Sequence, residues 1–204
     1  MGAIESWLAE YGLVVVLLNV NYEDQGVRAA PGLGVIEKSA QVFRLRSIAD
    51  HEPLASARYA RLMVRMLYGR PMASLNQFYF ELRDVPASRP LFNLLAARFV
   101  VSDANAAPRV VRWLTTPGFR LLWEDEGARV YENELALPRA SFVPVARLLT
   151  GDAEQLERLA DPQHDPRAVV LVEDAQLDGV GDPSATGSAS IVADTGERVA
   201  VQVH

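Results

Sequence analysis

The chain has 204 residues, half of them hydrophobic and 23% charged, which suits one good folded domain or two small ones. The formal net charge of -6 argues against a nucleic-acid partner, because binding a phosphate backbone requires clustered lysine and arginine. The absence of cysteine excludes disulfides and thiolate metal sites.

The sequence contains no segment that predicts a membrane span. Its longest uninterrupted apolar run, residues 13–18, is far shorter than the ~20 residues needed to cross a bilayer. The first residues also lack the basic region of a secretory signal. We therefore expect the chain as given to be soluble.

Helical and extended patterns alternate up to residue 137. The clearest predicted helix is 56–68, whose apolar residues recur every three or four positions and form one stripe: Tyr59, Leu62, Met63, Met66 and Leu67. Shorter helices are expected at 6–11, 90–97 and 108–114. Strands are expected at 13–18, 41–45 and 98–102, and a hairpin joins 119–123 to 128–132 through a turn containing Gly127. These patterns predict a mixed α/β lobe.

From residue 138 onwards the alternating pattern of strands dominates. Strands are expected at 140–145, 169–172, 187–192 and 198–203, with one helix at 152–159 capped by Asp152. Residues 174–188 are polar and rich in Gly, Asp, Pro and Ser, and predict a long exposed connection. The fold class is therefore expected to be α+β: a mixed α/β lobe at 1–137, followed by an incomplete, sandwich-like β-rich lobe at 138–204.

Residues 131–140, with the sequence YENELALPRA, are the most informative stretch. Val130 and Glu132 alternate with Tyr131, as in an extended strand. The stretch predicts a strand that ends in a polar turn, followed by a second strand entered through Pro138, which cannot donate to a sheet ladder.

This stretch resembles a phrase in the YfhO family, a family of large bacterial multi-pass membrane proteins. Residues 93–103 (NLLAARFVVSD) and 165–171 (DPRAVVL) are similar to two further phrases of that family. The resemblance implies that the chain is a soluble, extracytoplasmic portion of a cell-membrane protein. Because the family continues beyond residue 204 into further strands, it also implies that the chain is truncated.

YfhO-like proteins are similar to glycosyltransferases that take a sugar from a polyprenyl-phosphate donor. The catalytic acid of that class lies in loops that would precede Met1, so the resemblance places no catalytic residue on this chain. It implies an accessory portion that shapes the acceptor side. A lipid-linked sugar or cell-envelope glycan would be met through the parent protein, and membrane contact would come only through missing flanking helices.

One loop gives candidate residues that could face such a substrate. Residues 50–54 (DHEPL) resemble the family's GYDPL phrase, which precedes a helix with an arginine and a tyrosine. The candidates are Asp50, His51, Glu52, Arg58 and Tyr59. The sharper interpretation is contact with a sugar or phosphate. The simpler one is an acidic lead-in to the helix, because Glu52 favours the positive end of the helix dipole.

Metal and cofactor sites are not predicted. The histidines His51, His164 and His204 lack the spacing of a zinc site. The aspartates Asp174, Asp178 and Asp182 do not match the ligand spacing of an EF-hand, and a solvated loop explains them better. The tryptophans Trp7, Trp113 and Trp123 suit either a sugar platform or the core, and core is the more usual place.

A different class of function also fits the sequence. The chain could be a free-standing binding or interaction module without enzymatic activity. If the chain is truncated, as the resemblance implies, we expect the strand at 198–203, with valines at alternate positions, to expose an unfinished sheet edge.

Overall fold

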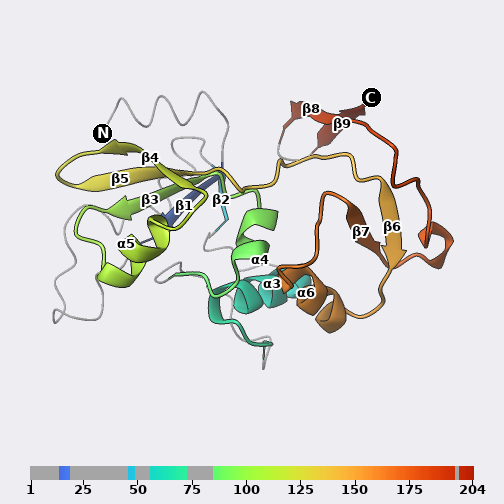
Figure 1. The fold of residues 1–204 in the computed structure, drawn as a ribbon, viewed down its shortest axis with the longest axis horizontal. Coiled ribbons are helices and arrows are strands. Elements are labelled where there is room, and N and C mark those ends of the chain that lie inside the picture. The colour runs from blue at the N-terminus through green and yellow to red at the C-terminus, as the bar shows by residue number, and fades with distance from the viewer. Residues whose placement is uncertain (1–13, 19–45, 49–55, 73–84, 196–197) are drawn as a thin grey trace. The chain divides into compact units, whose positions relative to one another are not determined.

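In a computed structural model the described residues are 14–18, 46–48, 56–72, 85–195 and 198–204. The helix expected at 6–11 and the strand expected at 41–45 lie outside them. Helices and several small sheets are both present, which confirms the α+β class. The chain divides into two compact units, Met1–Leu137 and Pro138–His204, and each is described by itself (Figure 1).

The first unit contains a five-stranded mixed sheet. Its strands are arranged in the order β2-β1-β3-β5-β4. Their bounds are β1 Val14–Leu18, β2 Arg46–Ser47, β3 Phe99–Asp103, β4 Phe119–Glu124 and β5 Ala128–Asn133. β1 runs parallel to both β2 and β3, whereas β5 runs antiparallel to β3 and β4. The predicted hairpin at residues 119–132 is therefore confirmed.

Helices α3 (Ala57–Tyr68), α4 (Arg89–Leu94) and α5 (Pro108–Leu114) confirm the three helices predicted between residues 56 and 114. The Ser56 side chain caps α3 by accepting from the backbone N–H of Tyr59. Gly69 ends the helix in the left-handed conformation, with φ at 66°, which glycine adopts without a steric penalty. The buried stripe of α3 includes Ala60 and Val64, so the helix is turned slightly from the predicted face.

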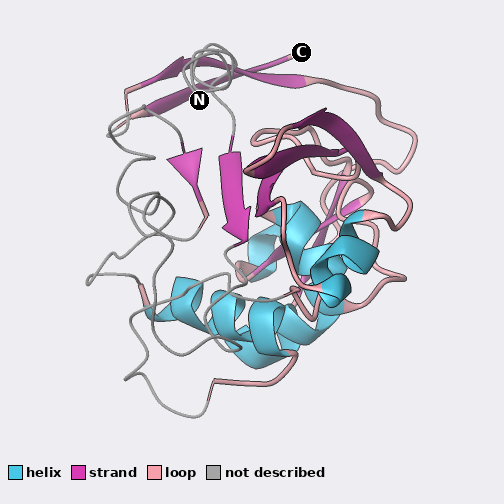
Figure 2. Cartoon of the chain, turned by 90° about the vertical axis from the view of Figure 1, so that its left-hand side faces the viewer, coloured by secondary structure: helices cyan, strands magenta, loops and turns pink. Residues whose placement is uncertain are grey.

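The apolar core of this unit is built from its helices and from the middle of its sheet. Its largest fully buried side chains are Phe92, Met63, Met66, Leu91, Leu114, Val64, Val100, Val110 and Val130. Backbone N–H groups of Ala87 and Ser88 donate to the carbonyls of Leu67 and Met66, which ties the end of α3 to the start of α4. Figure 2 shows the helices in cyan and the strands in magenta.

The second unit has two separate two-stranded sheets. Strand β6 (Val145–Leu148), helix α6 (Asp152–Ala160) and strand β7 (Val169–Val172) form a parallel pair joined by a helix. After the short 3₁₀ helix η1 (Ala175–Leu177), strands β8 (Ala189–Asp194) and β9 (Val199–Val203) form an antiparallel hairpin. The strands of this unit therefore lie in two separate small sheets.

Two expectations for this unit were wrong in detail. The strand predicted at 140–145 is at Val145–Leu148, and no strand follows Pro138 until then; Pro144 immediately before β6 also lacks a backbone N–H. Asp152 is the first residue of α6 and not its cap, because Gly151 holds that position without a side-chain hydrogen bond. The connection at residues 174–188 is largely exposed, as predicted.

None of the helices in the described segments has the length and apolar character required to cross a bilayer.

Candidate functional site

The residues predicted to face a sugar or phosphate fall into two groups. Outside the described residues lie Asp50, His51 and Glu52. Arg58 and Tyr59 lie in the first turn of α3, where Arg58 is exposed and Tyr59 half-buried. The Tyr59 hydroxyl donates a hydrogen bond to the backbone carbonyl of Ile48, just after β2. Tyr59 therefore fastens the start of α3 to the segment beside the sheet.

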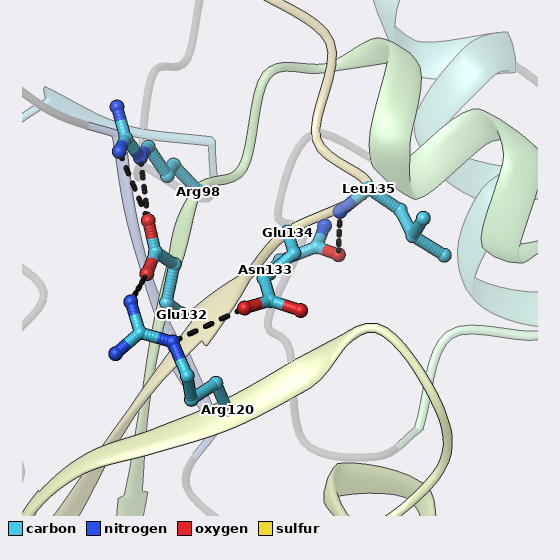
Figure 3. Close-up of polar contacts among 6 residues, drawn as sticks. All are labelled: Arg98, Arg120, Glu132, Asn133, Glu134 and Leu135. Carbon is cyan, nitrogen blue, oxygen red and sulfur yellow. Dashed lines mark hydrogen bonds and ion pairs between the residues drawn. The ribbon is translucent and has the colours of Figure 1, made fainter.

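A different set of polar residues comes together at the end of β5. The carboxylate of Glu132 lies between two guanidinium groups (Figure 3). Arg98 donates to Oε1 of Glu132 from Nε at 3.0 Å and from Nη2 at 2.9 Å. Arg120 donates to the other carboxylate oxygen, Oε2, from its Nη2. We refer to Arg98, Arg120, Glu132 and Glu134 as the arginine–glutamate cluster.

The strand register places these residues together. Arg120 on β4 is the direct cross-strand partner of Glu132, and Phe99 on β3 is its partner on the other side. Arg98 immediately precedes Phe99, and its side chain reaches the same carboxylate. Opposite charges at facing positions of neighbouring strands stabilise their pairing.

Burial differs sharply within the arginine–glutamate cluster. The Glu132 side chain is only 12% exposed, while those of Arg98 and Arg120 are 54% and 58% exposed. Arg120 also donates from Nε to Glu134 at 3.1 Å. A carboxylate removed from water needs charged or hydrogen-bonding partners, and the two arginines supply them. The cluster thus neutralises a buried charge at the end of β5.

Asn133, the next residue, is 1% exposed and its amide is fully hydrogen-bonded. Its Nδ2 donates to Oδ1 of Asn93 at 2.9 Å and to the Ala97 carbonyl at 3.1 Å. Its Oδ1 accepts from Arg89 Nη2 at 3.2 Å and from the Leu135 N–H at 3.3 Å. Both donors and the acceptor of this side chain are therefore satisfied inside the unit.

Arg89 joins this amide to an aromatic group. Its guanidinium lies 3.8 Å from the ring centre of Phe119 and 5.5 Å from that of Trp113. It also donates from Nε to Asn93 Oδ1 at 3.3 Å and from Nη1 to Thr116 Oγ1 at 3.3 Å. Partial burial lowers the pKa of Arg89 from its usual range. We call Arg89, Asn93 and Asn133 the polar brace, because they join α4 to the end of β5.

Backbone hydrogen bonds strengthen the connection that the polar brace makes. The N–H of Asn133 donates to the Arg98 carbonyl at 2.7 Å, and that of Leu137 donates to the Asn93 carbonyl at 2.9 Å. The chain leaving β5 is therefore held against the segment that leads from α4 into β3. Nearby, burial raises the pKa of the Tyr131 hydroxyl above its ordinary value.

The residues considered for metal or sugar binding have other partners. Each aspartate considered for calcium accepts a backbone N–H: Asp174 from Gln176, Asp178 from Leu148 and Asp182 from Ser184. Across the described segments, no three His, Asp or Glu side chains gather closely enough to hold a metal ion.

Of the tryptophans considered for a sugar platform, Trp7 lies outside the described residues. Trp113 meets Phe92 and Phe119 edge to face, with ring centres 5.3 and 4.6 Å apart. It therefore takes part in the packing of α4, α5 and β4. Trp123 is half-buried in β4.

Sequence reasoning identified the phrases that contain Asn93, Arg98, Glu132 and Asn133, but did not predict that these residues touch. One signal was available. A hairpin with its turn near residue 126 places Arg120 opposite Glu132. The contact of Asn133 with Asn93 and Arg89 has no local signal, because 40 or more residues separate the partners.

No family model matches this chain, and neither a curated protein nor a solved structure was found to be similar to it.

Proposed function

We propose that the chain is a non-catalytic, extracytoplasmic portion of a membrane protein that resembles the YfhO family and shapes the acceptor side of a lipid-linked-sugar glycosyltransferase. One observation carries the proposal. The two strongest phrases of the resemblance, residues 93–103 and 131–140, lie against each other through side-chain and backbone hydrogen bonds. Two segments that are joined in this way belong to one structural unit. If the chain shares a fold with the YfhO family, its matching phrases should lie together in this manner.

The contacts of the phrase residues support a structural role for them. The Glu132 carboxylate accepts from two guanidinium groups, and the Asn133 amide has partners for both donors and its acceptor. A general acid or nucleophile must be able to reach a reacting atom. Side chains committed to neighbours in this way hold the end of β5 in place.

The parent protein would lie in the cell membrane, with this portion on the extracytoplasmic face. Its partners would be a lipid-linked sugar or a cell-envelope glycan, met together with the rest of the parent protein. The net charge of -6 agrees with the absence of a nucleic-acid partner from this proposal.

A transfer assay tests the non-catalytic part of the proposal. The chain is incubated with a polyprenyl-phosphate sugar and candidate glycan acceptors, with a purified polyprenyl-phosphate-sugar glycosyltransferase as the positive control for the donor. We expect no transfer from this chain. Reproducible turnover that is lost on changing one acidic residue, such as Glu132→Gln, would overturn the proposal.

The coding sequence on either side of this segment tests the membrane part. We expect apolar runs of about 20 residues on both sides, long enough to span a bilayer. A start codon and a stop codon directly at the ends of the segment would instead favour a free-standing binding module.

A further inference from the structure

In the described part of the chain, the β8–β9 hairpin leaves one edge of β9 open. Among the described residues, β9 pairs only with β8. His204 exchanges hydrogen bonds with Ser188, at 2.9 Å through its N–H and 3.0 Å through its carbonyl. Backbone groups alternate in direction along an antiparallel strand, so every second residue of β9 faces β8. The N–H and C=O groups of Val199, Val201 and Val203 therefore point away from β8, towards the open edge.

The same valines form an apolar row on one face of the hairpin. Their exposed fractions are 48% for Val199, 48% for Val201 and 61% for Val203. Natural edge strands are usually protected from pairing by charges, prolines or bulges. The sequence of β9, VAVQV, contains no charge, proline or glycine. Nothing within the strand itself therefore blocks pairing at this edge.

The β8 strand is protected in ways that β9 is not. Its register shifts between Ile191 and Ala193, which marks an irregularity of the bulge type. Its last residue, Asp194, forms an ion pair with Arg139 at 2.7 Å. The hairpin thus has one irregular, charged strand and one regular, apolar strand.

We propose that β9 pairs antiparallel with β9 of a second copy of this chain. Centring the pair on Val201 places this residue opposite its own copy and Val199 opposite Val203. Each of these facing pairs would exchange both backbone hydrogen bonds, because their N–H and C=O groups already point outwards. A two-fold interface of this kind needs a patch that is complementary to itself, and the spacing of the valines provides one.

Charge also favours a second copy as the partner. The strand VAVQV carries no charged side chain that would be repelled by its own copy. The nearest charged residue on the N-terminal side, Arg198, would lie opposite His204 of the other copy. The two Arg198 side chains therefore do not face each other across the pair. The inference uses only the β8–β9 hairpin and is independent of the proposed function.

Sedimentation velocity on the full chain, from about 1 to about 500 µM, measures the association. We expect a monomer–dimer equilibrium. Val201→Lys places two ammonium groups face to face across the pair. We expect their repulsion to weaken the dimer by about tenfold or more. Gln202→Lys adds the same charge on the opposite face and is the matched control, with an expected change below about threefold.

A cysteine cross-link tests the register of the pair, since the chain has no cysteine of its own. In an antiparallel hydrogen-bonded pair the facing Cα atoms lie about 5.5 Å apart, within reach of a disulfide. Val201→Cys should therefore give a covalent dimer under mild oxidation. Gln202→Cys would lie opposite Ala200 of the other copy and should cross-link much less.

Circular dichroism of each variant establishes that it is folded, and the cysteine variants decide the result if Val201→Lys does not fold. A wild-type chain that stays monomeric throughout the concentration range would overturn the proposal. So would a dimer equally sensitive to both lysine substitutions, or equal cross-linking at positions 201 and 202.

Discussion

The end of β5 and the β8–β9 hairpin use strand edges in opposite ways. At the end of β5, β3 and β4 cover both sides, and the buried Glu132 and Asn133 find their partners within one unit. The hairpin has only two strands and leaves its valines about half exposed. Long-range polar contacts therefore fix the position of the end of β5. The hairpin depends on local pairing and keeps a surface that another strand can use.

The two units also differ in how many side chains they bury. Among the described residues, the nine largest fully buried side chains are all in Met1–Leu137, and Val145 is the only buried hydrophobic residue in Pro138–His204. The second unit contains several turns in which an aspartate accepts a backbone N–H two residues later, as at Asp161, Asp165 and Asp182. Substitutions should therefore act through different mechanisms in the two units.

The largest expected effect is at the polar brace. Asn133→Ala removes the amide that joins Asn93, Ala97 and Arg89, and leaves buried groups without partners. We expect the free energy of unfolding to fall by about 3 kcal/mol. Denaturant unfolding followed by tryptophan fluorescence measures the change. Asn105→Ala, at an exposed position, is the control, with an expected loss below about 0.5 kcal/mol. Equal losses for the two variants would show that the hydrogen bonds of the polar brace contribute no more to stability than an exposed side chain does.

The second unit should be most sensitive at Gly181. Its φ is 113°, and an added Cβ would lie 1.9 Å from the carbonyl oxygen of Pro144, where Gly181 forms a bridge with Val145. We expect Gly181→Ala to destabilise the unit by about 2 kcal/mol. Gly179, with φ at 70°, has open space around the same position, so Gly179→Ala should cost only about 1 kcal/mol of backbone strain. Hydrogen exchange of the β6 and β7 amides measures the loss of stability in each variant. Equal losses for Gly181→Ala and Gly179→Ala would show that the contact with Pro144 does not add to the destabilisation.

A smaller effect is expected in the arginine–glutamate cluster. Glu132→Gln leaves Arg98 and Arg120 without their shared charge, but both arginines are more than half exposed to water. We expect a loss of about 1 kcal/mol, smaller at high salt. Glu134→Gln, whose side chain is 52% exposed, should change stability by less than about 0.5 kcal/mol. A salt-independent loss for Glu132→Gln would point to packing and not to charge as its cause.

The smallest expected effect is a pH dependence from His164. Its Nε2 is buried with no hydrogen-bond partner within the described residues. Burial, and then the charge of Arg158, lower the pKa of His164, while Asp165 and Asp161 act in the opposite direction. The unfolded chain therefore binds a proton more readily than the folded one. Stability should fall as the pH drops through about 6.5 and level off below the folded pKa.

Unfolding of the wild type and of His164→Gln between pH 5 and pH 8 measures this slope. The variant should lose part of the pH dependence, and the difference should appear in the hydrogen exchange of the second unit. Identical pH profiles would show that the folded chain does not keep His164 neutral.

Much of the local structure could be predicted from the sequence. Helix α3 follows from its apolar spacing, its cap Ser56 and its stop at Gly69, and α5 follows from Pro108 at its start. These signals work because they act within one or two turns of the chain. The prediction of a strand at residues 140–145 had the wrong bounds, because an apolar pattern does not show which backbone groups find a hydrogen-bond partner. Pairing with β7 begins only at Val145, directly after Pro144.

The sequence by itself determined the α+β class, most helices and strands of the described segments, and the phrases that contain the polar residues. Only the tertiary structure decided what those residues do. Asn93 and Asn133 are 40 residues apart, and no local rule joins them until the sheet order places β5 beside β3. The tertiary structure also decided that β9 has one open edge, because an edge is defined by which strands are absent beside it among those described.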